Sequence, residues 1–202
     1  MKLQYVELTS INDKLLLPWL DLYETSFPPE EKILVSRFLR YLDPDFEEDG
    51  VQNHLVAAVN EHGEFVGLMF YRIRSATGAF SLWYLATLPE LRGNGVGAQC
   101  YLEVVRRAQE KGSPFVVFEV EVPEASPDAE LARRRIGFYR RLGAKLLGGI
   151  RLVQKMGIHA SEVQMNVMIH PLTSITPQQA FDIAAEYVDN EGLSQIGELA
   201  LD

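Results

Sequence analysis

A glycine-rich stretch in the middle of the chain, Arg92-Gly93-Asn94-Gly95-Val96-Gly97, carries the clearest chemical signal. It lies between the apolar run Leu82–Leu88 and an amphipathic segment that stops near Gly112, which predicts a strand, a tight loop and a helix. Free N–H groups at a helix N-terminus attract phosphate, and glycine lets the backbone approach the anion because it has no Cβ atom. The sequence therefore predicts a bound phosphorylated ligand. The alternative is a set of glycines that only form a turn and cap a helix.

Two common phosphate-binding motifs fit this stretch poorly. A nucleotide triphosphatase loop needs a Lys-Ser or Lys-Thr pair after its last glycine, whereas Ala98 and Gln99 follow here. The glycines satisfy the letters of the dinucleotide-binding fingerprint, with Glu119 near the distance of its acidic residue. However, the segment Pro89–Arg92 separates the strand from the glycines, and the strand comes too late to open a βαβ unit.

A third motif, R/Q-x-x-G-x-G/A after a strand, matches at every fixed position through Arg92, Gly95 and Gly97. It is the pyrophosphate loop of the GNAT superfamily of N-acetyltransferases, which this chain resembles. The preceding YLATLPEL resembles the central strand and turn of the family. IGFYRRLG at Ile136–Gly143 resembles a later helix that carries Phe-Tyr and ends in Leu-Gly, although Ala144 stands where the family usually has Phe. The resemblance covers residues 56–147.

The resemblance implies an acetyl-CoA-dependent N-acetyltransferase that moves the acetyl group to a primary amine by direct attack. It implies that the loop holds the coenzyme diphosphate, while the main chain of the central strand contacts the pantetheine arm and the acyl carbonyl. The coenzyme-binding residues would then be Leu85, Ala86, Thr87, Arg92, Gly93, Asn94, Gly95, Val96 and Gly97. The acceptor, a small molecule or a peptide, stays open. So do two alternatives: a non-catalytic CoA-binding or sensing module, and a transferase for another acyl-CoA.

Tyr139 is, by the same resemblance, the general acid at the coenzyme sulfur. A tyrosine of pKa ~10 donates fully to a thiolate of pKa ~8.5 only at a cost of about 2 kcal/mol, so we expect hydrogen bonding to the sulfur to matter more. Arg135 precedes it by one helical turn and favours tyrosinate character. The alternative is a core aromatic that packs beside Phe138.

Glu119 and Glu121 are the candidate bases. Side chains alternate along the predicted strand Phe115–Val122, so both carboxylates point to one face and Phe118 and Val120 to the other. A primary amine of pKa ~10.4 is protonated at pH 7, and freeing its lone pair costs about 4.6 kcal/mol. The glutamates would take that proton directly or through water. The alternative is a strand end that reaches solvent.

The segment Phe27–Glu31 joins two predicted helices, in a region that borders the acceptor pocket in the family. Its candidate wall residues are Trp19, Tyr23, Phe27 and Glu30. The alternative is ordinary helix packing around a turn that Pro28 and Pro29 fix.

The patterns predict one domain over residues 1–202, with an α/β fold of the α+β type. It is a GNAT-like three-layer fold with a mixed, mostly antiparallel sheet, a parallel pair at the phosphate loop and helices on both faces. Helices are expected over Ile11–Ser26, Glu30–Leu42, Gly95–Lys111, Ser126–Leu142 and Thr176–Asn190. Strands are expected over Leu3–Leu8, His54–Asn60, Glu64–Ser75, Leu82–Leu88, Phe115–Val122, Ala144–Arg151 and Glu162–His170. The last residues, Glu191–Asp202, are expected to be partly disordered or an oligomer contact.

Composition narrows the functional classes. The 202 residues carry a net charge of −9, which argues against non-specific nucleic-acid binding and is compatible with a cationic acceptor. No apolar run approaches the ~20 residues that span a bilayer, and the single cysteine, Cys100, excludes an internal disulfide. The four histidines show no ligand spacing, so no metal is predicted. We therefore expect a cytoplasmic protein with no membrane partner; a homodimer is suggested only by the family.

Overall fold

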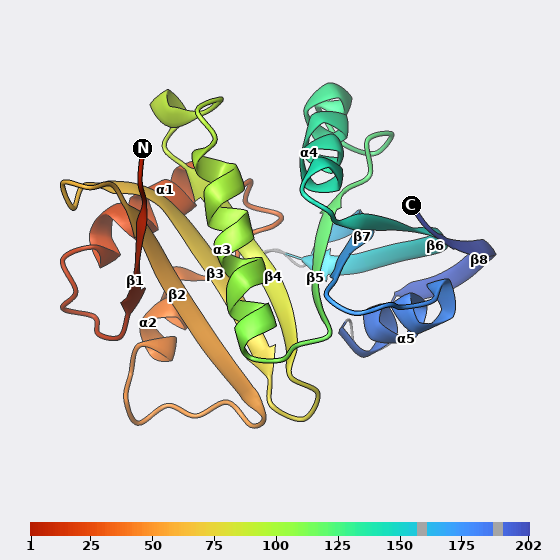
Figure 1. Cartoon of the computed structure of the whole chain (residues 1–202), viewed down its shortest axis with the longest axis horizontal. Helices are drawn as coiled ribbons and strands as arrows, with labels where there is room; N and C mark the ends of the chain where they lie inside the picture. Colours follow the sequence, from red (N-terminus) through yellow and green to blue (C-terminus); the bar gives the residue numbers. More distant parts are fainter. Residues whose placement is uncertain (157–160, 188–191) are drawn as a thin grey trace.

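The structure, a computed structural model, describes residues 1–156, 161–187 and 192–202. Its core is an open eight-stranded sheet of order β1-β2-β3-β4-β5-β7-β6-β8 (Figure 1). The strands are β1 (Gln4–Leu8), β2 (Val51–Val59), β3 (Phe65–Arg74), β4 (Ala79–Thr87), β5 (Phe115–Glu121), β6 (Lys145–Met156), β7 (Ser161–Pro171) and β8 (Leu193–Leu201). Each described pair of neighbours is antiparallel except β4 and β5, which are parallel. The predicted mixed sheet with one parallel pair is confirmed.

Helices cover both faces of this sheet (Figure 1). α3 (Val96–Glu110) and α4 (Ala129–Arg141) pack on the face to which Val116, Phe118 and Val120 of β5 point. On the opposite face, α1 (Leu16–Ser26) and α2 (Val35–Tyr41) cover β2 to β4. α5 (Pro177–Tyr187) covers the same face farther along the sheet, where Phe115 and Val117 point. Successive strand residues alternate between the two helical layers, as the three-layer prediction requires.

A β-bulge in β4 decides which side chains face which layer. Tyr84 pairs with Phe70 and Leu82 pairs with Tyr71, so Trp83 is an extra residue in the ladder. Leu82 packs in the α3 layer, whereas Tyr84 packs in the α1–α2 layer. On a regular strand, residues two positions apart point to the same face. The bulge therefore reverses which side chains of β4 point to which helical layer, just before Leu85–Thr87.

The C-terminal residues form an edge strand, which the sequence analysis did not predict. β8 runs antiparallel to β6, with Leu201 opposite Leu147. Gly149, at φ 77°, makes this close approach possible, because an added Cβ atom would lie 2.1 Å from the carbonyl oxygen of Glu198. Residues 188–190 of the expected terminal helix, and Glu191 of the expected tail, lie outside the described residues. None of the described helices is long and apolar enough to span a bilayer.

Candidate active site

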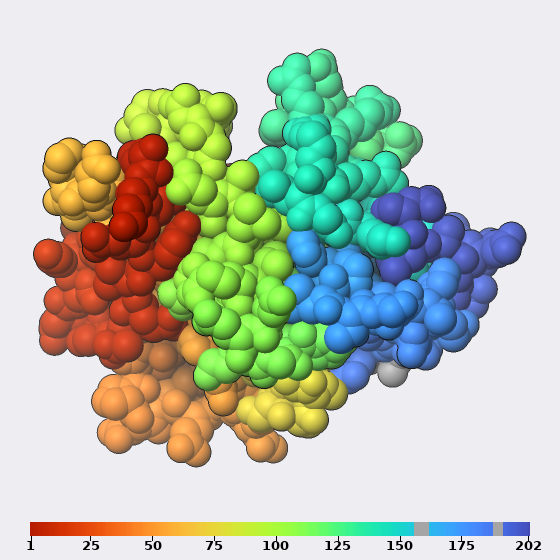
Figure 2. Space-filling model, viewed as in Figure 1, coloured from red at the N-terminus to blue at the C-terminus, as the bar shows by residue number. Residues whose placement is uncertain are grey.

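The candidate site lies where the parallel strands separate. β4 and β5 pair only through Phe80–Val116 and Ser81–Val117 in the described structure, and they diverge beyond these pairs. A cavity of about 1550 Å³ occupies the opening, and the surface above it is hollowed between the loop before α3 and α4 (Figure 2). Ligand pockets commonly measure about 300–1,000 Å³. This cavity therefore has room for two reactants.

The glycine loop ends at the N-terminus of α3, beside the cavity. Gly93 and Gly95 adopt φ of 79° and 78°, and Gly95 is the N-cap. The first helical hydrogen bond runs from the N–H of Gln99 to the oxygen of Gly95 at 3.1 Å. The three residues between Gly95 and Gln99 have N–H groups with no acceptor within the helix, so these groups are available to an anion. Arg92 lines the cavity itself.

The second half of β4 forms one wall of the opening. Leu85, Ala86 and Thr87 pair with β3 along one edge, while the described structure places no strand against their other edge. All three line the cavity. Main-chain groups of this stretch are thus available for a ligand that lies along the strand.

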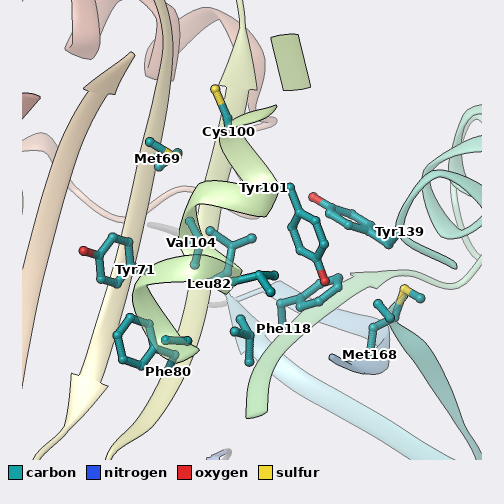
Figure 3. Packing of buried hydrophobic residues seen from close by; sticks show 14 of the residues in the cluster. Met69, Tyr71, Phe80, Leu82, Cys100, Tyr101, Val104, Phe118, Tyr139 and Met168 are labelled. Carbon is teal, nitrogen blue, oxygen red and sulfur yellow. The ribbon is translucent and has the colours of Figure 1, made fainter. Parts of the chain in front are cut away.

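Tyr139 enters the opening from α4. Its ring packs against Tyr101 of α3 and Phe118 of β5, with centroid distances of 4.9 and 4.5 Å (Figure 3). Burial raises the pKa of Tyr139 to about 12, against a smaller lowering by Arg135. The Tyr101 hydroxyl lies 3.0 Å from Nδ1 of His170, which fixes the ring that supports Tyr139. A pKa of about 12 makes Tyr139 a better hydrogen-bond donor to sulfur than a source of a free proton.

The two candidate bases have different surroundings. Glu121 forms an ion pair with Arg135 of α4. Glu119 lines the cavity, and burial raises its pKa to about 8; a hydrogen bond with Gln154 lowers this pKa and the nearby Glu31 raises it. Glu119 is therefore the carboxyl whose basicity approaches that of an amine, whereas the guanidinium partner balances the charge of Glu121.

Glu31 is a cavity residue that the sequence analysis did not select. The expected helix Glu30–Leu42 begins only at Val35, because two buried tyrosines hold the preceding segment. The Tyr84 hydroxyl donates to the oxygen of Glu31 at 2.7 Å and accepts from the N–H of Ile33 at 3.2 Å. The Tyr23 hydroxyl donates to the oxygen of Ile33 at 2.9 Å. Burial, with Glu121 as the next cause, raises the pKa of Glu31 to about 7.

The expected wall residues are therefore only partly right. Phe27 lines the cavity. Trp19 and Tyr23 are fully buried in the core beneath it, and Glu30 is exposed outside it. The sequence put the correct segment at the cavity but the wrong one of two adjacent glutamates, because the turn that orients them depends on Tyr84, far along the chain.

The C-terminal third adds a wall that sequence patterns did not reveal. Gln154 of β6, Met165 of β7 and Tyr187 of α5 all line the cavity. Arg74 of β3 donates from Nη2 to the oxygen of Glu186 at 3.4 Å, which ties the end of α5 to the sheet. Only the order β5-β7-β6 brings these residues to Glu119, and periodicity within one helix or strand does not specify that order.

Comparison with known proteins agrees with this geometry. The sequence model of the Acetyltransferase (GNAT) family matches residues 16–144. A search of curated protein sequences finds no match to the chain.

Solved structures of GNAT proteins share the fold. A protein from Bacteroides thetaiotaomicron assigned to the GNAT acetyltransferases is 21% identical, with a TM-score of 0.70 over 95% of this chain and 97% of that one. An aminoglycoside 6′-N-acetyltransferase complexed with coenzyme A is 17% identical (TM-score 0.61, 87% and 99% covered). The ribosomal-protein-S18-alanine N-acetyltransferase of Escherichia coli is 15% identical, with a TM-score of 0.57 over 87% of this chain and 97% of that one. These likenesses concern the fold, and the family match covers more than half of the sequence: the chain belongs to the GNAT acetyltransferase family.

Proposed function

We propose that this protein is an acetyl-CoA-dependent N-acetyltransferase that acetylates a primary amine by direct attack. One observation carries the proposal: the opening between β4 and β5 joins the glycine loop and Tyr139 on one face of the sheet to Glu119 on the other. A thioester placed in this opening is within reach of an acceptor that arrives from the opposite layer.

The coenzyme half follows from the exposed backbone. Amides at the start of α3 bind the diphosphate, and Arg92 adds a positive charge. The unpaired edge of Leu85–Thr87 binds the pantetheine amides in the manner of an added strand, and an N–H of this edge stabilises the negative charge that develops on the acyl oxygen.

Glu119 takes the amine proton in this proposal. Transfer from an ammonium of pKa ~10.4 to a carboxylate of ordinary pKa ~4.3 is uphill by about 8 kcal/mol. With a carboxyl pKa of about 8, the same transfer costs only about 3 kcal/mol. At pH 7 only about a tenth of Glu119 is ionised, and forming the ionised state costs about 1.4 kcal/mol. This cost is smaller than the reduction in the cost of proton transfer that the raised pKa brings.

The remaining steps balance the reaction. The amine nitrogen attacks the acyl carbon, the C–N bond forms and the C–S bond breaks, so that sulfur leaves as thiolate. The nitrogen loses two protons in all: the first goes to Glu119 before the attack, and the second leaves as the amide forms and passes through solvent to the thiolate. Tyr139 hydrogen-bonds to the sulfur while it leaves, and Glu119 releases the first proton to solvent. The products are the N-acetylated amine, free coenzyme A and one proton.

Two measurements test the proposal. Titration calorimetry with coenzyme A is expected to show binding, and absence of affinity would refute the proposal. Thiol release from acetyl-CoA is then measured against a panel of primary amines. Binding without thiol release for any amine would instead support a non-catalytic CoA-binding module. Competition between acetyl-CoA and longer acyl-CoA esters tests the choice of acyl group.

A further inference from the structure

Three carboxyl groups and one guanidinium meet where the segment after α1 faces β5. Glu31 interacts electrostatically with Glu121 and Arg135, and Glu119 interacts with Glu31. Arg135 is already the ion-pair partner of Glu121. Glu31 and Glu119 have no guanidinium of their own here, and repulsion between carboxylates is strong where burial keeps water away, which favours their protonated forms. A bound cation between Glu31 and Glu119 would stabilise the ionised form of both.

Three further basic side chains that line the same cavity have acidic partners of their own. Lys32 pairs with Glu24 at 2.6 Å, and Arg134 pairs with Glu130. Arg72 pairs with Glu48 and also stacks on Trp83, with its guanidinium carbon 4.7 Å from the ring centroid. These pairs reduce the positive charge that the lining offers to a carboxylate or phosphate group on the acceptor, although Arg37, Arg92 and Lys155 line the cavity too.

Aromatic rings border the two carboxyl groups. Phe27 from the end of α1, Trp83 from the bulge of β4 and Tyr187 from α5 all line the cavity. Tyr187 also interacts electrostatically with Glu119, Arg72 and Tyr84. Aromatic walls bury an apolar body, and their faces attract an ammonium group.

We propose that the acceptor is a cationic primary amine with an apolar body, that its ammonium group binds between Glu31 and Glu119, and that Tyr187 covers the body. This inference rests on the proposed function and names the class of its substrate. The C-terminal α5, which lies beyond the family match, thereby becomes part of the specificity-determining wall.

Binding is measured by calorimetry on the full chain saturated with coenzyme A, which has no acetyl group to transfer. The probes are 2-phenylethylamine, the neutral 2-phenylethanol and the zwitterion phenylalanine. We expect the amine to bind at least about 10-fold more tightly than either analogue, the ratio that one partly buried charge pair supplies. Equal binding of the alcohol, or tighter binding of phenylalanine, would overturn the inference.

Matched variants locate the site. Glu31→Gln is expected to weaken binding of 2-phenylethylamine about 10-fold, whereas Glu30→Gln, an exposed neighbour, leaves it unchanged. Tyr187→Ala is expected to weaken binding of 2-phenylethylamine, whereas Tyr187→Phe is expected to preserve it. Both variants are expected to keep the affinity for coenzyme A. Unchanged amine affinity in Glu31→Gln would overturn the inference. The wild-type coenzyme titration separates the two claims: no coenzyme binding refutes the proposed function, whereas coenzyme binding without amine selectivity refutes this inference alone.

Discussion

Arg135 of α4 forms an ion pair with Glu121 of β5, and this contact gives different properties to two glutamates that share one face of a strand. Glu121 has its charge balanced by a guanidinium. Glu119 has a hydrogen bond with Gln154 and stays in the cavity with a pKa of about 8. The ion pair also joins α4, which carries Tyr139, to the strand that carries the proposed base.

Exchange of Glu119 for Gln is expected to lower kcat/KM about 100-fold, the low end for loss of a general base. The groups that face its carboxyl from the packed elements are Glu31, Gln154 and Tyr187. Because the base works ionised, activity of the wild type rises with pH up to about 8, and the variant loses this limb. The titration of the acceptor itself, near pH ~10.4, remains in both profiles. Glu121→Gln is the control; a limb near 8 that persists in Glu119→Gln would remove Glu119 from the mechanism.

Stability should fall as pH rises from about 4.5 to about 8. Burial raises the pKa values of Glu31 and Glu119 to about 7 and 8 from 4.5, so the folded state binds more protons than the unfolded state in this window. The double variant Glu31→Gln/Glu119→Gln should show a smaller decrease. Urea unfolding at pH 5 and pH 8 measures the difference. An identical decrease in both proteins would contradict the raised pKa values.

Tyr139→Phe is expected to retain the fold and the affinity for coenzyme A but to lower turnover about 100-fold, through loss of the hydrogen bond to the leaving thiolate. Single-turnover thiol release measures this step apart from binding. Tyr101→Phe removes a hydroxyl next to the same ring and serves as the control, with turnover within a few-fold of the wild type. Full activity in Tyr139→Phe would exclude the residue from catalysis.

Gly95→Ala is expected to weaken coenzyme binding about 10-fold or more. Both Gly95 and Gly78 have positive φ, at 78° and 66°, and an added Cβ atom at either position meets no atom within 4 Å. The two alanine variants therefore carry the same kind of backbone strain, about 1 kcal/mol. Gly78 lies in the hairpin between β3 and β4, away from the loop. Calorimetry should show a loss of affinity for Gly95→Ala alone, and equal losses would point to general destabilisation.

Gly149→Ala is expected to lower the melting temperature by several degrees, because its Cβ atom would overlap the Glu198 carbonyl in β8. Gly148→Ala is the matched control, since its Cβ atom would lie 3.6 Å from that of Ala200, an ordinary contact. Thermal unfolding followed by circular dichroism compares the two. Equal melting temperatures would show that β8 contributes little to the stability of the folded chain.

Local patterns in the sequence predicted the parts of the molecule that local physics determines. The strand–loop–helix around Gly95 follows from glycine placement and an amphipathic period. The alternation that put Glu119 and Glu121 on one face also holds, because Phe118 and Val120 pack in the layer of α3. These features need no information from distant segments.

The parts that the sequence did not reveal depend on long-range contacts. Glu31 faces the cavity only because Tyr84 bonds its backbone and prevents a helix from starting there. Tyr187 reaches Glu119 only because β7 inserts between β5 and β6. The different environments of the two glutamates arise from Arg135 on another element. One sequence taken by itself gives no signal for any of these pairings.

The short β4–β5 ladder has a consequence for how the molecule holds together. Among the residues that the structure describes, two ladder pairs, Phe80–Val116 and Ser81–Val117, join the half of the sheet with β1 to β4 to the half with β5 to β8. A coenzyme that bridges the main chain of β4 and the helices above it acts as a missing cross-link between these halves. Free coenzyme at 100 times its dissociation constant would add about 2.7 kcal/mol to the free energy of unfolding, so the melting temperature would rise with the coenzyme concentration.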